Sequence, residues 1–100
     1  MVKLILNHYL SDRGIKMPPK SSNSSYSKEE QQFLKNIGFK IQFLRKQRGI
    51  SQSELAESSG LSDTTISHLE STSAYGISMI ALYRIAKALD VDPGQILTFK

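Results

Sequence analysis

The sequence has 100 residues, the length of a single domain, and no cysteine, which excludes disulfide bonds and thiolate metal sites and fits a reducing cytoplasm. No apolar run approaches the roughly 18 residues of a membrane-spanning helix, so we expect a cytoplasmic protein that does not contact a membrane. A net charge of +4 permits a nucleic-acid partner without requiring one.

The N-terminal quarter of the chain differs in composition from the rest. Residues 1–16 fit both the alternation of a strand and, from Leu6 onward, the spacing of a helix, and the choice stays open. Residues 17–27 contain two prolines and many serines, which predicts a linker. We therefore divide the chain into an N-terminal arm and linker over residues 1–27 and a folded domain over residues 28–100.

A long helix is predicted over residues 28–48. Ser27 and Glu30 have the spacing of a capping box, and Gly49 is a typical residue for the C-terminal end. The apolar residues spaced for one face of this helix are Phe33, Ile37, Ile41 and Leu44. Gly38 can weaken or bend the helix, so two shorter helices are an alternative.

Four shorter helices follow. Ser51, Ser62, Ser78 and Asp92 each stand where a side-chain oxygen can cap a first turn, and Gly60 separates the first two of these helices at little conformational cost. The residues expected to face inward are Leu55, Ala56, Ile66, Leu69, Leu82, Ile85, Ala86 and Leu89. With no convincing strand, the pattern predicts an all-α domain of five helices.

Residues 52–71 place two of these helices very close together. Ala56 lets the helices cross, Gly60 makes the turn, and Ile66 and Leu69 hold the second helix against the core. The opposite face of that helix is then presented to solvent at a fixed angle. A helix-turn-helix reader of the DNA major groove requires this arrangement.

Several motifs occur together here: Gln-x-x-Leu-Ala, Gly-Leu-Ser and Ile-x-x-Leu-Glu within residues 52–70, and Ile-Ala-Lys-Ala-Leu at 85–89. With them, residues 36–97 resemble the phage-repressor (Cro/cI, XRE) helix-turn-helix family. The resemblance implies a lambda-repressor-like DNA-binding domain and a transcriptional regulator, expected to be a repressor. It implies sequence-specific binding to double-stranded DNA, with helix 62–71 in the major groove, and no cofactor.

The resemblance also implies roles for individual residues. Arg45 and Glu70 match a buried ion pair that ties the first helix of the domain to the third, and Gln52 matches a residue that contacts phosphate and braces the recognition helix. The expected contacts to bases and phosphates are Gln52, Ser62, Asp63, Thr64, Thr65, Ser67 and His68. Because residues 51–76 contain no Lys or Arg, phosphate neutralisation is expected from Lys40, Lys46 and Arg48. Each of these polar residues also fits an ordinary solvated helix surface.

The chain departs from the family pattern after the recognition helix. Relatives usually continue Glu-Arg-Gly-Lys, whereas this chain reads Glu-Ser-Thr-Ser-Ala-Tyr-Gly over residues 70–76, so its loop is longer and lacks basic residues. Hydroxyl and amide contacts position a protein on DNA without releasing counterions as Lys and Arg do. We therefore expect modest affinity per domain and a strong dependence on dimerisation.

Apolar residues toward the C-terminus exceed the needs of so small a core. They either form a homodimer interface or are covered by the N-terminal arm, and the residues concerned are Ile80, Tyr83, Ile96, Leu97 and Phe99. A dimer would place two recognition helices about 34 Å apart on a pseudo-palindromic operator.

A second class of function fits the same fold. The domain could serve as a protein-interaction module, antitoxin-like or an antagonist, that grips a partner with residues 1–27. An enzyme is not expected, because the sequence has no Gly-rich phosphate loop, no Cys nucleophile and no recognisable Ser–His–Asp spacing. No metal site is expected either, since His8 and His68 are the only histidines.

Overall fold

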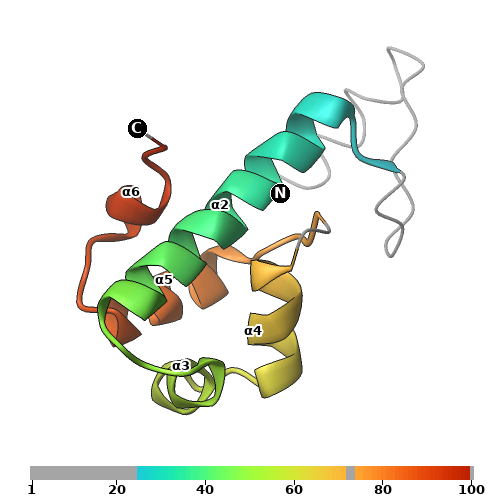
Figure 1. Cartoon of the computed structure of the whole chain (residues 1–100). Coiled ribbons are helices and arrows are strands. Elements are labelled where there is room, and N and C mark those ends of the chain that lie inside the picture. Colours follow the sequence, from blue (N-terminus) through green and yellow to red (C-terminus); the bar gives the residue numbers. More distant parts are fainter. Residues whose placement is uncertain (1–24, 72–73, 100) are drawn as a thin grey trace, which may run out of the picture.

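The computed structural model describes residues 25–71 and 74–99, which form five helices and no strand (Figure 1). The helices are α2 (Lys28–Gln47), α3 (Gln52–Ser59), α4 (Asp63–Glu70), α5 (Met79–Ala88) and α6 (Pro93–Ile96). The prediction of an all-α domain is confirmed. The predicted arm and most of the linker lie outside the described residues. Among the described residues, no helix combines the length and apolar character needed to cross a bilayer.

The helix ends follow from local sequence. The hydroxyls of Ser27 and Ser51 accept hydrogen bonds from the backbone N–H of Glu30 and Glu54, so the predicted capping box of α2 is complete, and α3 begins with a second one. Gly60 has a φ of +73°, the left-handed conformation that glycine adopts without strain. The first helix of the domain ends one residue earlier than predicted.

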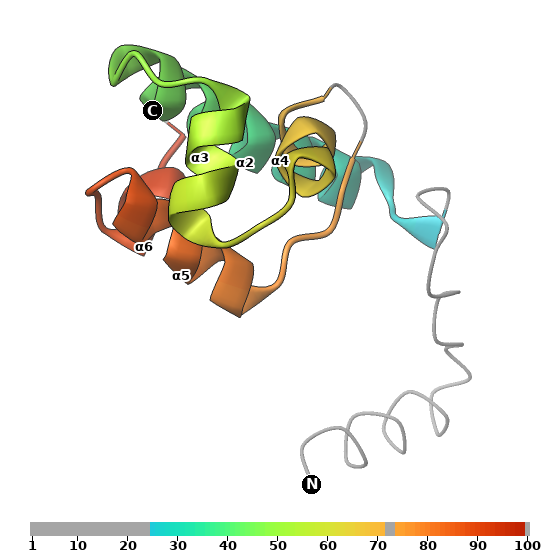
Figure 2. The same ribbon diagram turned by 90° about the horizontal axis from the view of Figure 1, so that it is seen from below.

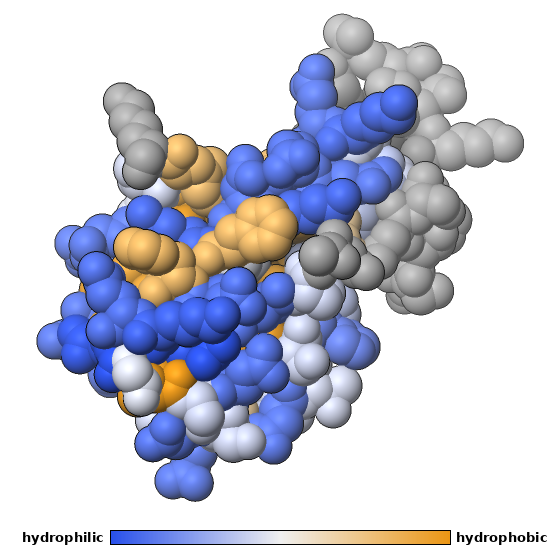
Figure 3. Space-filling model, in the orientation of Figure 1, coloured by the Kyte–Doolittle hydropathy of each residue, from blue (hydrophilic) through white to orange (hydrophobic). Residues whose placement is uncertain are grey.

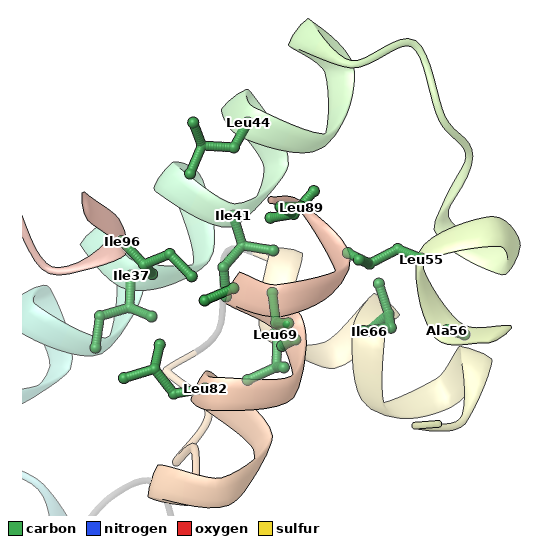
Figure 4. Packing of buried hydrophobic residues seen from close by; sticks show 12 residues of the cluster. Ile37, Ile41, Leu44, Leu55, Ala56, Ile66, Leu69, Leu82, Leu89 and Ile96 are labelled. Atoms are coloured by element: carbon green, nitrogen blue, oxygen red, sulfur yellow. The ribbon is translucent and has the colours of Figure 1, made fainter. Parts of the chain in front are cut away.

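The helices enclose one small core, to which all five contribute (Figure 4). α2 packs against α4 and α6, and Figure 2 shows α3 between α4 and α5. The largest fully buried side chains are Ile41, Leu55, Ile66, Ile85, Leu89 and Ile96. The prediction that Ile96 contributes to a dimer interface is therefore wrong, because its side chain fills the core of its own chain.

Gly38 is the point at which α2 and α4 meet. The helix continues through this residue, so the alternative of two shorter helices is wrong. A Cβ atom at Gly38 would overlap the carbonyl oxygen of Leu69 and lie 3.2 Å from its carbonyl carbon. The absent side chain lets the C-terminal end of α4 rest directly on α2, which fixes the orientation of α4.

Candidate nucleic-acid interface

The α3–turn–α4 unit is closed by short-range hydrogen bonds. After Gly60, the N–H of Leu61 donates to the carbonyl of Ala56 at 3.1 Å, which ends α3. The Ser62 hydroxyl then accepts from the N–H of Thr65 at 3.0 Å, which begins α4. The unit therefore turns within three residues, and the apolar side of α4 is directed into the core.

A buried ion pair fixes the C-terminal end of α4. Arg45 of α2 donates from Nε and Nη2 to the two carboxylate oxygens of Glu70, at 2.7 and 2.9 Å, as the resemblance implied. The side chain of Glu70 is 1% exposed. Arg45 Nη1 also donates to the carbonyl of Ile50 at 2.7 Å, so one guanidinium joins α2, the following turn and α4. The hydrogen bonds with Glu70, with the attraction of its charge, raise the pKa of Arg45 against the opposing effect of burial.

Gln52 completes this network. Its Nε2 donates to Glu70 Oε1 at 3.1 Å, which links the first turn of α3 to the last turn of α4. The bracing role expected for Gln52 is therefore present in the structure. The expected phosphate contact of the same residue stays a prediction.

The predicted reading residues of α4 do not all face the same way. Thr64, Ser67 and His68 are exposed, whereas Ile66 is buried. At about 100° per residue, Thr64 and His68 lie on the side of α4 opposite Ile66, and Ser67 lies at its flank. Asp63 is also exposed and accepts a hydrogen bond from Ser53 at 3.4 Å, whereas Thr65 is half-buried with its hydroxyl 2.9 Å from that of Ser62.

Tyr75 is a site residue that the sequence reasoning missed. Its ring packs edge-to-face against the imidazole of His68, with ring centroids 5.1 Å apart. Tyr75 also packs against the hydrophobic core, so it limits the directions in which His68 can point. The signal was the departure from the family pattern itself, since the altered loop after α4 contains an aromatic residue.

Comparison with known proteins identifies this unit. The sequence model of the helix-turn-helix family matches residues 41–96, which is more than half of the chain. The chain belongs to the helix-turn-helix family. No curated protein sequence matches it significantly.

Solved structures of transcription regulators share the fold. The restriction-modification controller protein C.AhdI from Aeromonas hydrophila is 30% identical, with a TM-score of 0.60 over 63% of this chain and 94% of that one. The hypothetical transcription factor NHTF from Neisseria is 27% identical, with a TM-score of 0.62 over 82% of this chain and 80% of that one. The clp gene regulator ClgR from C. glutamicum is 26% identical, with a TM-score of 0.60 over 65% and 83%. This helix-turn-helix protein is a DNA-binding regulator of transcription.

The predicted phosphate-neutralising cations, Lys40, Lys46 and Arg48, lie on α2 and at its C-terminal cap, outside the helix-turn-helix unit. Lys46 is exposed near the end of α2, whereas Lys40 is half-buried with its Nζ 6.0 Å from the ring centroid of Phe43. Arg48 donates to Asp90 at 3.3 Å in an exposed ion pair. The positive charge of Arg48 is therefore partly neutralised within the domain. Of the three cations, Lys46 is the one that is exposed and has no ion pair or ring contact among the described residues.

The five residues predicted for the dimer interface are not brought together. Ile80 and Tyr83 are well exposed on α5 beside Met79, and Ile96 is in the core. Leu97 is partly exposed after α6. Phe99 packs edge-to-face against Phe33 of α2 with ring centroids 5.9 Å apart, so it belongs to the α2 side of the helix-turn-helix domain.

Proposed function

We propose that this regulator reads the major groove of operator DNA with Thr64, Ser67 and His68 of α4. The observation that carries the proposal is that these three side chains are exposed on a helix whose opposite side is held by Gly38, Glu70 and the core. A reading helix must be held rigidly, because a base contact depends on a fixed position of the side chain relative to the groove.

Phosphates are held at the N-terminal ends of α3 and α4. Both helices present free backbone N–H groups there, and Gln52 and Ser62 stand at these ends. Lys40 and Lys46 supply the positive charge that the helix-turn-helix unit lacks. Asp63 and Thr65 support the turn rather than the bases, since their side chains are engaged by Ser53 and Ser62.

The regulator binds as a cytoplasmic homodimer and represses by occupying its operator. The exposed apolar face of α5, formed by Met79, Ile80 and Tyr83, supports a two-fold interface between copies. Such a dimer fits half-sites about 34 Å apart, one turn of DNA, on a pseudo-palindrome.

The decisive experiment is selection from a random duplex DNA library with the full chain and with a Thr64→Ala/His68→Ala variant. The wild type should enrich one two-fold-symmetric sequence, and the variant should not. Thr98→Ala is the matched control for the threonine substitution, because it changes an exposed threonine beyond α6 and should enrich the wild-type sequence. Enrichment of the same sequence by the double variant would contradict the assigned reading residues, and failure of the wild type to enrich any sequence at low salt would contradict the proposed function.

A further inference from the structure

Four phenylalanine side chains outside the α3–turn–α4 unit are partly exposed to solvent. Phe33, Phe39 and Phe43 of α2 and Phe99 near the C-terminus are 49%, 45%, 58% and 41% exposed, and we call them the phenylalanine face. Figure 3 shows apolar side chains gathered over α2 and beside the C-terminal segment. Scattered single apolar residues are ordinary on a protein surface, but a group of large aromatic side chains marks a site of association.

The phenylalanine face is shaped as a hollow between two segments. Phe39 and Phe43 line it from α2 with Asn36 and Lys40, and Phe99 closes it from the C-terminal side, giving an open pocket of about 360 Å³. Phe33, Phe39 and Phe99 also lie outside the residues that match the helix-turn-helix family. Three of the four phenylalanines are therefore not part of the helix-turn-helix sequence pattern, and DNA binding by that pattern does not account for the pocket.

The charges around the pocket identify the kind of partner that fits. The sequence has no acidic residue between Glu30 and Glu54, while Lys35, Lys40 and Lys46 lie on α2 within that span. None of these three lysines forms an ion pair with the residues that the structure describes. A second copy docked through the same face would bring lysine against lysine, so self-association is disfavoured here.

We propose that the phenylalanine face docks an acidic amphipathic segment of another protein. Apolar side chains of that segment enter the pocket between Phe39, Phe43 and Phe99, and its carboxylates pair with Lys35 and Lys40. An amphipathic helix laid into an apolar groove is a common mode of peptide recognition. The docking does not use the exposed side chains of α4, so the sequence preference for DNA should not depend on it. Lys40 is shared with the proposed phosphate contacts, so the acidic segment and DNA should compete for this one lysine.

The test is selection of random 16-residue peptides against the full chain, followed by affinity measurement with fluorescently labelled peptides. Enriched peptides should combine acidic residues with apolar residues at helical spacing. A Phe39→Ser/Phe43→Ser variant should bind them at least about tenfold more weakly, as expected for loss of central aromatic anchors. The matched control is Leu97→Ser, which removes a partly exposed apolar side chain that does not line the pocket and should bind the peptides as the wild type does.

Charge reversal separates a specific site from a merely apolar one. Lys35→Glu/Lys40→Glu should lower the affinity for the acidic peptides. Peptides whose acidic residues are exchanged for lysine should bind this variant but not the wild type. Circular dichroism should show wild-type helicity for each variant, because the substituted side chains are partly exposed. The Phe39→Ser/Phe43→Ser variant should still select the wild-type DNA sequence, which distinguishes failure of this proposal from failure of the proposed DNA reading.

Four outcomes would overturn the proposal. Peptide binding could be unaffected by the phenylalanine substitutions, or the enriched peptides could lack acidic residues. Binding of a single-stranded oligothymidine that is lost in the phenylalanine variant would assign the face to nucleic acid, since exposed aromatic rings beside cations also stack bases. Self-association lost in the same variant, measured by sedimentation, would assign it to a second copy.

Discussion

At the scale of single residues, Glu70 links three helices through its side chain. Its buried carboxylate accepts from Arg45 and Gln52, so it connects α2, α3 and α4. Glu70→Gln should lower the free energy of unfolding by about 3–5 kcal/mol, because it leaves the buried Arg45 charge uncompensated. Urea denaturation monitored by circular dichroism measures the loss. Since pairing raises the pKa of Arg45, the guanidinium stays charged in the folded protein, and the loss should not change between neutral and mildly alkaline pH.

Two controls distinguish this effect from a general cost of removing charge. Arg48→Met breaks the exposed pair with Asp90 and should cost no more than about 1 kcal/mol. Arg45→Met/Glu70→Leu removes both buried charges and should cost much less than Glu70→Gln alone. Equal losses in the single and double variants would contradict an uncompensated charge as the cause.

Tyr75 gives a prediction about specificity. Tyr75→Leu keeps an apolar side chain in the loop but removes the ring that packs against His68. The freed imidazole should tolerate more bases at the position it reads, so DNA selection should yield a consensus degenerate at that position and unchanged elsewhere. A consensus unchanged at every position would contradict the positioning role of Tyr75.

Among the helices, the crossing of α2 and α4 depends on Gly38. Alanine is favoured over glycine in a helix by about 1 kcal/mol, but here its Cβ would overlap the backbone of Leu69. Gly38→Ala should therefore lower the free energy of unfolding by about 1–3 kcal/mol, as overpacking does elsewhere. It should also weaken operator binding, because α4 must shift.

Gly94 provides the matched control for this change. It lies in α6, and a Cβ there meets no atom within 4 Å. Gly94→Ala should be neutral or slightly stabilising, as measured by the same urea denaturation. If Gly38→Ala also proved stabilising, the close contact of α2 with Leu69 would not exist in solution.

The helices were predictable because their ends are encoded locally. Ser27 with Glu30 and Ser51 with Glu54 satisfy the first N–H groups of their own helices, and the apolar spacing specifies the inward side. The crossing at Gly38 was not predictable in this way, because it depends on α4, which lies about 30 residues further along the chain. The sequence indicated only that a glycine weakens a helix.

The sequence was sufficient to locate the segment that forms the site, but not to predict which of its side chains are exposed. The family motifs place α4 and the Arg45–Glu70 pair correctly. They do not reveal that Asp63 is held by Ser53, or that Thr65 turns toward Ser62, because these contacts depend on side-chain orientations. The apolar C-terminal residues were likewise indistinguishable by composition, although Ile96 is buried and Tyr83 is exposed.

For the protein as a DNA-binding body, the uneven charge distribution governs the effect of salt. Residues 51–76 contain no Lys or Arg. In the proposed dimer, four lysines without an ion pair among the described residues are assigned to phosphates, Lys40 and Lys46 of each copy. Each neutralised phosphate contributes about −0.9 to the slope of log affinity against log salt concentration, which predicts a slope of about −4 for these residues. Fluorescence anisotropy titrations of the selected operator at several KCl concentrations measure this slope.

Substitution of one lysine tests where the phosphate charge is neutralised. Lys46→Ala should make the slope shallower by about 2 in a dimer, because two phosphate contacts are lost, while the selected sequence stays the same. Lys28→Ala removes an equally exposed lysine at the other end of α2 and should leave the slope unchanged. A slope that Lys46→Ala leaves unaltered would mean that another part of the chain, such as the four Lys and Arg residues within 1–27, neutralises the phosphates instead.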